Sequence, residues 1–317
     1  MKNNQTTVSE FILLGFTDIQ KLQLLLFTIF LCSYLLTIMG NAVIITISHI
    51  DYRLHTPMYF FLQNFSFLEI SFTTAIIPQT LAHLATGNKS ISYVGCMVQC
   101  FLYFHLGTTK FFLLAVMSFD RYVAICNPLR YTSIMSHHLC LSLVLFCWVG
   151  SFLLIIGPLI LFLQFPICDS NILDHFFCDN TPLLKLLCGD TWLLGFLGFI
   201  TAALSLLGTL TITVVSYINI IKTVLRMPSA TGRQKAFSTC ASHFIVVSIT
   251  YGSCIFLYIK PTQSGKLELG KMVAILNTVV SPLFNPFIYS LRNKQVQESL
   301  RDALGQLTAI AKRPRKN

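Results

Sequence analysis

Charged side chains are scarce in this sequence: 22 Lys and Arg and 12 Asp and Glu make up only 11% of its 317 residues. Ordinary soluble domains carry roughly a quarter charged residues. A soluble fold of this length would therefore lack the charge that its surface needs. Hydrophobic residues reach 54%, and they are gathered in long runs. Several runs are long enough to cross a bilayer core about 30 Å thick as helices.

Charge, proline and turn residues divide the apolar sequence into seven runs, so we predict an all-α membrane protein with a seven-transmembrane helix bundle. The predicted spans are 24–48, 58–82, 97–119, 140–163, 193–221, 236–259 and 272–291. The first run is too long for a signal peptide and follows a mostly polar stretch, so we expect it to remain as an anchor. We divide the chain into an extracellular segment 1–23, a seven-transmembrane domain 24–291 and a cytoplasmic tail 292–317.

The tail contains a pattern typical of a short amphipathic helix. Val296, Leu300, Leu304 and Leu307 fall on one helical face. We expect this helix to lie at the membrane interface with that face resting on the bilayer.

The distribution of Lys and Arg predicts the orientation, because cytoplasmic loops carry the excess. With the N-terminus outside, the inner segments hold Arg53, Arg121, Arg130, Lys222, Arg226, Arg233, Lys235, Arg292, Lys294, Arg301, Lys312, Arg313, Arg315 and Lys316. The outer segments hold half as many: Lys2, Lys21, Lys89, Lys185, Lys260, Lys266 and Lys271. The net charge of +10 then faces anionic lipid and cytosolic partners, and no basic domain for nucleic acid remains.

Four of the eleven cysteines fall on the predicted outer side, where disulfides persist. They are Cys96, Cys168, Cys178 and Cys188, and two bridges among them allow three pairings. Two glycosylation sequons, at Asn4 and Asn88, also lie on that side.

Six runs of residues, in order and at matching helix positions, resemble the odorant (olfactory) receptors, a family of rhodopsin-like class A G-protein-coupled receptors. They are Gly40-Asn41, Leu54-His-Thr-Pro-Met-Tyr-Phe-Phe-Leu62, Met117-Ser-Phe-Asp-Arg-Tyr-Val-Ala-Ile-Cys126, Ser216-Tyr217, Lys235-Ala-Phe-Ser-Thr-Cys-Ala-Ser-His243 and Pro282-Leu-Phe-Asn-Pro-Phe-Ile-Tyr-Ser-Leu-Arg-Asn293. A single one of these patterns is weak, whereas six together are specific and cover almost the whole chain.

This resemblance implies a receptor, not an enzyme, that needs no cofactor and binds a small volatile ligand. It implies that the partner is the stimulatory olfactory-type G protein, which raises cyclic AMP, and that the receptor lies in the plasma membrane, in the cilia of olfactory neurons. It also implies two disulfides, Cys96 with Cys178 and Cys168 with Cys188. Together they would hold the long outer loop over the pocket.

In receptors of this class the pocket lies between helices 3, 5, 6 and 7. The corresponding residues here are Tyr103, Phe104, Gly107, Thr108, Ala202, Ser205, Tyr251, Cys254, Tyr258, Ile275 and Thr278. An amine ligand would need a carboxylate and an acid would need an inward Lys or Arg, and this set contains neither. The set predicts an apolar, aromatic cavity with a few hydroxyls, suited to a small neutral molecule.

The resemblance also assigns a coupling and switch set. Its members are Asp120, Arg121, Tyr217, Lys235, His243, Asn285, Pro286 and Tyr289. Arg121 can pair locally at rest and be released when helices move. Pro286 removes a backbone hydrogen bond and provides a bend point. Tilting of the helix that begins near Lys235 would uncover a cleft for a partner helix.

Two charged residues, Glu69 and Lys110, fall deep in predicted spans, where an ionisable side chain is costly. At ~1.5 Å per residue they lie ~16 Å and ~14 Å from the inner boundary, so we predict that they pair. Odorant receptors commonly carry Glu at the Lys110 position, and many rhodopsin-like receptors hold a sodium ion near the carboxylate at the Glu69 position. Our hypothesis is that the Lys110 ammonium replaces that ion, with Asn41 and Asn285 nearby. Such a pair would lower constitutive activity or impair signalling.

Other classes fit less well. The span 272–291 lacks the lysine that a retinal protein needs, and a transporter would show paired repeats. An insect-type channel would have the opposite orientation, and no enzyme-like cluster gathers at one depth. His175, Cys178 and Asp179 could bind a soft metal, but a bridged Cys178 offers no thiolate, so we expect no metal site. A chemoreceptor for an endogenous metabolite outside olfactory tissue remains the main alternative.

Overall fold

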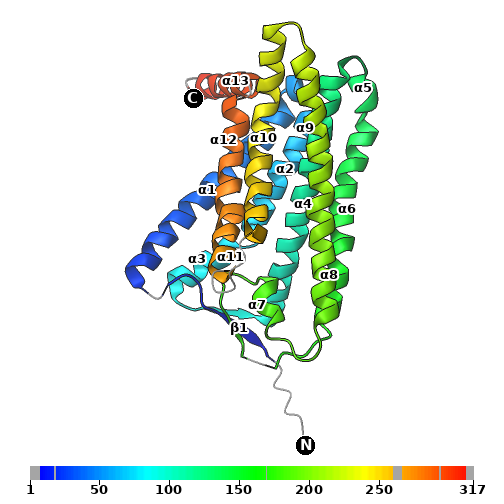
Figure 1. Ribbon diagram of the computed structural model, residues 1–317. Coiled ribbons are helices and arrows are strands. Elements are labelled where there is room, and N and C mark those ends of the chain that lie inside the picture. The colour runs from blue at the N-terminus through cyan, green and yellow to red at the C-terminus, as the bar shows by residue number, and fades with distance from the viewer. Residues whose placement is uncertain (1–7, 18, 169, 260–265, 293, 312–317) are drawn as a thin grey trace, which may run out of the picture.

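The chain folds as a helical bundle with a small sheet at one end (Figure 1), in a computed structural model that describes residues 8–17, 19–168, 170–259, 266–292 and 294–311. Six helical segments are long and apolar enough to cross a membrane: Gln20–Ile50, Pro57–Thr86, Tyr93–Cys126, His137–Phe162, Trp192–Arg226 and Gly270–Tyr289. A seventh is formed by the bent pair Ala230–Ser238 and Cys240–Phe256, which meet at 43°. The predicted seven-helix architecture is confirmed.

Most bounds of the helices extend past the predicted apolar runs, because the helices continue beyond the hydrocarbon core into the loops, whereas the fourth and sixth spans end within a residue of the predicted end. The spans are formed by α1 (Gln20–Ile50), α2 (Pro57–Thr74) with α3 (Ile77–Thr86), α4 (Tyr93–Cys126), α6 (His137–Phe162), α8 (Trp192–Ala203) with α9 (Thr209–Arg226), α10 (Ala230–Ile259) and α11 (Lys266–Ile275) with α12 (Ser281–Arg292). Shorter helices are α5 (Tyr131–Ile134) and α7 (Asn180–Leu184), and α13 (Lys294–Ala311) follows α12.

Three spans are interrupted besides the bent sixth one. The second span bends between Thr74 and Ile77, where Pro78 cannot donate a backbone hydrogen bond. The fifth contains a π-helical turn at Leu204–Gly208, and the seventh contains one at Leu276–Val280. Such π turns often occur at functional sites, because they rotate the side chains that follow. Neither turn was predicted from the sequence.

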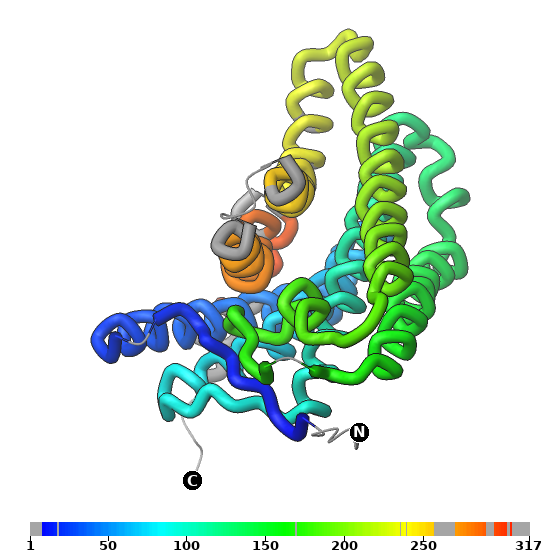
Figure 2. The backbone as a smooth tube through the Cα atoms, turned by 60° about the horizontal axis from the view of Figure 1, so that its bottom comes forward, coloured from blue at the N-terminus to red at the C-terminus, as the bar shows by residue number. Residues whose placement is uncertain are grey.

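A three-stranded sheet covers one end of the bundle, which we call the sheet end. Its strands are β1 (Glu10–Leu13), β2 (Ser90–Ser92) and β3 (Ile172–Leu173), in the order β2-β1-β3. β1 is antiparallel to β2 and parallel to β3. Figure 2 shows the N-terminal strand lying between the two others across this end. No strand was expected in the N-terminal segment, yet β1 forms there and its Phe11 and Leu13 are fully buried.

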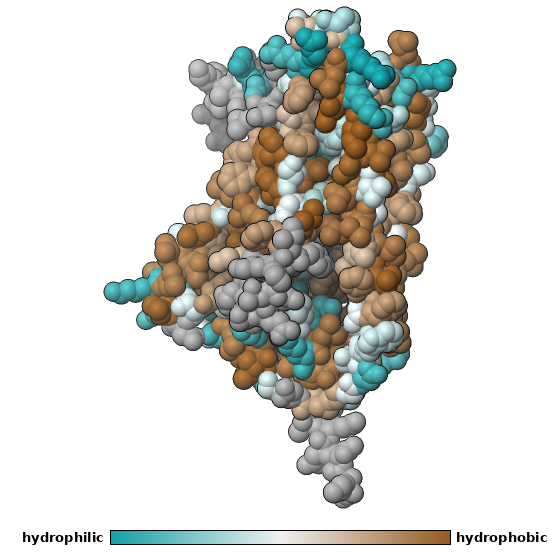
Figure 3. Space-filling view, viewed as in Figure 1, coloured by the Kyte–Doolittle hydropathy of each residue, from teal (hydrophilic) through white to brown (hydrophobic). Residues whose placement is uncertain are grey.

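The opposite end of the bundle carries α5 and α13, and we call it the α13 end. On the face of the bundle seen in Figure 3, apolar side chains dominate between the two ends, whereas hydrophilic side chains gather at the α13 end. Large apolar residues such as Leu24, Phe146 and Phe199 are more than 60% exposed. Such a belt is unstable in water and matches a bilayer.

The amphipathic α13 differs in one respect from its prediction. Val296 is buried, and Leu300 packs against the main apolar core, which contains Tyr59 and Ile47. This part of the apolar face therefore packs on the bundle and does not rest on the bilayer, because the start of α13 is tied down by a hydrogen bond from Tyr59 to Gln295. The side chains of Leu304 and Leu307 lie outside the described residues.

Candidate functional site

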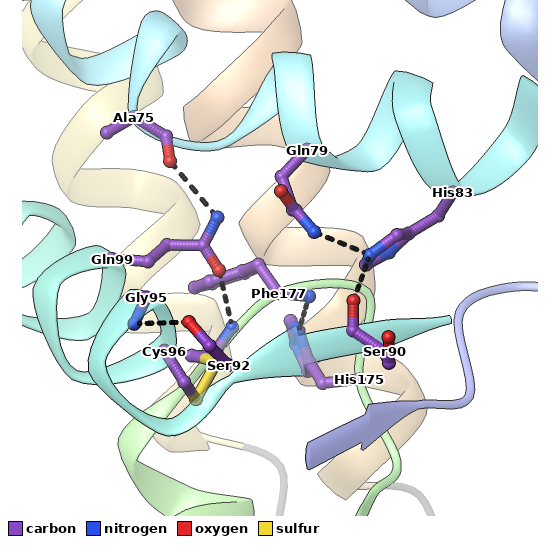
Figure 4. The surroundings of a disulfide bond; sticks show 11 residues. Ala75, Gln79, His83, Ser90, Ser92, Gly95, Cys96, Gln99, His175 and Phe177 are labelled. Atoms are coloured by element: carbon purple, nitrogen blue, oxygen red, sulfur yellow. Dashed lines mark hydrogen bonds between the residues drawn. A yellow bond between two sulfur atoms is a disulfide. The ribbon is translucent and has the colours of Figure 1, made fainter. Parts of the chain in front are cut away.

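The four cysteines on the sheet end form two disulfides, Cys96–Cys178 and Cys168–Cys188, with Cα atoms 5.4 and 5.5 Å apart. The first joins α4 to the long segment between α6 and α8, and the second closes a loop within that segment. Figure 4 shows that Gln99 reinforces the first bridge: its amide donates to the Ala75 carbonyl (3.1 Å) and accepts from the Cys178 N–H (3.0 Å). The bend of the second span, α4 and the loop are thus linked at one point.

The loop segment that precedes Cys178 packs into the sheet end of the bundle as an aromatic plug. Phe176 stacks on Phe16 of the N-terminal segment with ring centroids 4.6 Å apart, and Phe177 packs on Tyr103 of α4 at 4.6 Å. Asp174 accepts a hydrogen bond from the Lys271 ammonium of α11 (2.7 Å). The loop is therefore fixed to the N-terminal segment, to α4 and to α11.

His175 lies in this plug, 3% exposed, with its ring on Phe176 and Phe177. Its Nδ1 accepts the backbone N–H of Phe177 (3.4 Å), which requires an unprotonated Nδ1. Burial, with a smaller contribution from the Lys271 ammonium, lowers the pKa of His175 from 6.5 to about 4.

We expect acid to destabilise the loop through His175. The unfolded imidazole takes up a proton near pH 6.5 and the folded one only near pH 4, so stability falls as the pH drops through this window and is level below it. The full effect is about 3 kcal/mol at most. The measurement is the melting temperature of the purified receptor from pH 7.5 to 4.5. The His175→Asn variant keeps a hydrogen-bond acceptor but does not titrate, so its melting temperature should fall less steeply with decreasing pH. Equal slopes of melting temperature against pH in the two proteins would show that His175 is not the titrating group.

The residues predicted for the pocket are distributed over α4, the fifth span, α10 and the seventh span. Tyr103 stacks on Phe72 of α2 (5.5 Å) and meets Phe104 edge to face (5.1 Å). Cys254 of α10 is partly buried. Gly107 leaves open space, because a methyl group there would meet only the Phe72 ring, at 3.9 Å. The side chain of Tyr258 lies outside the described residues.

The hydroxyls of the predicted pocket differ in availability. Thr278 donates to Ala274 O (2.7 Å) and Ser205 to Thr201 O (2.8 Å), so both are bonded within their own spans. The Tyr251 hydroxyl is buried and makes no hydrogen bond of normal geometry among the described residues, although the Thr209 and Thr213 hydroxyls of the fifth span lie near it. Leaving a buried hydroxyl unpaired is costly. Tyr251 is thus the predicted pocket residue best placed to accept a polar contact from a ligand.

Glu69 and Lys110 meet in the middle of the bundle. Lys110 Nζ lies 2.8 Å from Glu69 Oε1, and both side chains are buried. Lys110 also donates to Ser281 Oγ (3.1 Å), and Asn285 Nδ2 donates to Glu69 Oε1 (2.6 Å). Asn41 does not contact this pair and donates instead to Thr37 O and Pro282 O. The start of α12 is therefore held by polar contacts from α1, α2 and α4.

Arg121 lies at the α13 end of α4 and forms a buried ion pair with its neighbour Asp120. Its Nε donates to Asp120 Oδ2 at 3.0 Å. The Tyr131 hydroxyl of α5 donates to the other carboxylate oxygen at 2.8 Å. Asp120 thus holds both the guanidinium and the loop that follows α4.

The remaining described residues of the predicted switch set form no hydrogen bond with Asp120 or Arg121 and make contacts of their own. Tyr217 of α9 and His243 of α10 share a hydrogen bond between Oη and Nδ1 (2.8 Å), so the fifth and sixth spans are tied together. The Tyr289 hydroxyl is buried without a hydrogen-bond partner in the described part of the chain. Pro286 packs against Gly40, where a methyl group would come within 2.9 Å of Pro286 Cβ. The Lys235 side chain is outside the described residues.

Several structural partners were not predicted. Gln99, Ser281 and the Asp174–Lys271 bridge carry no local sequence signal, because each pairs with a residue far along the chain. Tyr131 of α5 pairs with Asp120 at the end of another helix, α4. A second unpredicted cluster joins α4 to α6, where Ser151 Oγ contacts His105 Nδ1 (3.0 Å) and Thr109 Oγ1 (2.6 Å). Among the described residues no group of three His, Cys, Asp or Glu side chains could hold a metal ion.

Comparison with known proteins identifies the chain. Residues 30–306 match the olfactory receptor family profile. Mouse olfactory receptor 6E1 is 57% identical over 94% of this chain and 96% of its own length, and human olfactory receptor 6C3 is 52% identical over 97% and 99%. The fold is similar to that of squid rhodopsin, with a TM-score of 0.69 over 95% of this chain and 91% of that one, at 17% identity. The chain therefore belongs to the olfactory receptor family of G-protein-coupled receptors, which are multi-pass membrane receptors and not enzymes.

Proposed function

We propose that this receptor binds small neutral, mostly apolar volatile molecules in a pocket between α4, the fifth span, α10 and the seventh span. The observation that carries the proposal is the chemistry of the predicted lining. Its described side chains are aromatic, aliphatic or hydroxylic, with one thiol at Cys254, and none is charged. The Tyr251 hydroxyl among them is buried without a hydrogen bond of normal geometry to the described residues. A ligand with a large apolar body and one polar group matches such a lining.

The sheet end then faces outside and the α13 end faces the cytoplasm. Two disulfides at the sheet end support this orientation, because they persist in oxidising surroundings. Asn88 is exposed at the same end and accessible to glycosylation; Asn4 lies outside the described residues. We place the receptor in the plasma membrane of olfactory neuron cilia.

Ligand binding at the sheet end would act on the α13 end through α10 and α12. We propose that tilting of α10 breaks the Tyr217–His243 hydrogen bond, frees Arg121 from Asp120 and uncovers a cleft for a helix of the stimulatory olfactory-type G protein, which raises cyclic AMP. Asn285, Pro286 and Tyr289 would form the bend of α12 that accompanies this motion.

A cyclic AMP reporter screen tests the proposal. Cells that express the receptor and the olfactory-type G protein are exposed to a chemically broad panel of neutral volatiles, with amines and carboxylic acids as matched charged compounds. We expect responses among the neutral compounds that weaken in Tyr251→Phe for ligands carrying a hydrogen-bonding group. No response to any neutral volatile, from a receptor shown to reach the surface and to couple, would overturn the proposal, as would responses confined to charged compounds.

A further inference from the structure

The polar cluster in the middle of the bundle is already neutral. It contains one carboxylate, Glu69, and one ammonium, Lys110, and in the part of the chain that the structure describes no other charged side chain contacts either of them. Both are shielded from solvent, with relative exposures of 0% and 3%. Adding a free cation here would leave one net positive charge in a medium of low dielectric, which is strongly unfavourable.

The oxygen atoms around Glu69 do not form a binding site for a sodium ion either. A sodium ion needs several oxygen ligands, but Glu69 Oε1 already accepts from Lys110 Nζ at 2.8 Å and from Asn285 Nδ2 at 2.6 Å. Glu69 Oε2, which is buried without a hydrogen-bond partner among the described residues, would offer only one oxygen. Ser281 Oγ accepts the second bond of the ammonium. The Phe65 and Phe72 rings lie 6.0 and 5.7 Å from Nζ, where a ring face stabilises a cation. The ammonium therefore occupies the position beside the carboxylate and is well satisfied there.

We propose that Lys110 is a built-in counter-ion: its ammonium takes the place of a free sodium ion beside Glu69 and fastens α12 to α2 and α4. Ser281 is the first residue of α12 and follows the π-helical turn Leu276–Val280 directly. Lys110 thus holds α12 at the point where the seventh span changes its helical geometry. A receptor built in this way holds its resting arrangement whatever the sodium concentration around it.

The first test measures the melting temperature of the purified, ligand-free receptor in sodium chloride and in choline chloride at equal ionic strength. For the natural sequence we expect the same value in both salts. A stabilisation specific to sodium that disappears in Glu69→Gln would overturn the proposal. Neither ligand nor G protein takes part, so the outcome is independent of the proposed function.

The second test removes the ammonium. Lys110→Ala leaves a buried unpaired carboxylate, so we expect a melting temperature lower by about 5 °C or more in choline and partial recovery in sodium. Propylammonium, which matches the atoms removed from the side chain, should also restore stability, whereas tetramethylammonium should not. The exposed Lys222→Ala is the matched control and should change nothing. If neither sodium nor propylammonium stabilises Lys110→Ala, the proposal is wrong.

A third variant covers the case in which Lys110→Ala does not fold. The double variant Glu69→Gln with Lys110→Met removes both charges and keeps the volume, and replacing a whole buried pair in this way is often neutral. We expect it to recover the folded yield that the single variant loses and to be insensitive to sodium. If the double variant folds as poorly as Lys110→Ala, the loss of folding does not come from the unpaired Glu69 carboxylate, and the ion pair is not the stabilising contribution of Lys110.

Discussion

Replacing Arg121 with Gln is expected to reduce the cyclic AMP response to that of cells without receptor, while ligand binding at the sheet end persists. Arg121 is buried against Asp120 at the α13 end of α4. In the active receptor we expect its guanidinium to leave Asp120 and to contact the G protein, and Gln supplies neither the charge nor the planar fork of donors that this contact needs. The measurement is a concentration–response curve in the reporter cells.

The matched control for Arg121 is Arg130→Gln, because Arg130 belongs to the same end of the bundle but is exposed. It should shift the curve little. Binding is followed separately, through the stabilisation that a ligand found in the screen gives to each purified variant. A normal response from Arg121→Gln would remove Arg121 from the coupling mechanism, and loss of ligand stabilisation in this variant would show that its role is in folding.

The seven spans could be predicted because a bilayer imposes one strong condition, a helix with about 20 apolar residues. The meeting of Glu69 and Lys110 could be predicted for a related reason: helix rise converts sequence position into depth, and two opposite charges at one depth in hydrocarbon have few other partners. In the structure their charged atoms are 2.8 Å apart. The disulfide pairing followed from resemblance, since the spacing of the four cysteines left three pairings open.

Features that depend on contacts across the chain could not be predicted. β1 has a short, unremarkable sequence, and it forms a strand only because β2 and β3 supply partners from distant segments. The π-helical turns likewise depend on packing between spans. Lys271 was read as a loop charge that sets orientation, yet it is buried and paired with Asp174. The length of the apolar run predicts the span, but it does not predict that α11 packs against the loop that contains Asp174.

Removing the Cys96–Cys178 disulfide is expected to have the second large effect, a loss of most surface receptor and of the response. This bridge closes a segment of 82 residues, whereas Cys168–Cys188 closes one of 20. In the chain-entropy model the longer loop stabilises by about 1 kcal/mol more. The first bridge also holds Cys178 where its N–H meets Gln99, next to Phe177 on Tyr103. Its loss should therefore release the aromatic plug over the pocket.

The comparison uses two double variants, Cys96→Ser with Cys178→Ser and Cys168→Ser with Cys188→Ser, so that neither variant keeps one thiol of a broken bridge. Surface receptor is counted by flow cytometry with an N-terminal tag, and the response is normalised to it. We expect the first variant to lose both and the second to keep a reduced, measurable response, because only the second keeps the Cys96–Cys178 bridge that holds the aromatic plug. Equal losses in the two variants would mean that the loop is held as one unit, and a larger loss in the second would place the anchor of the plug within the loop itself.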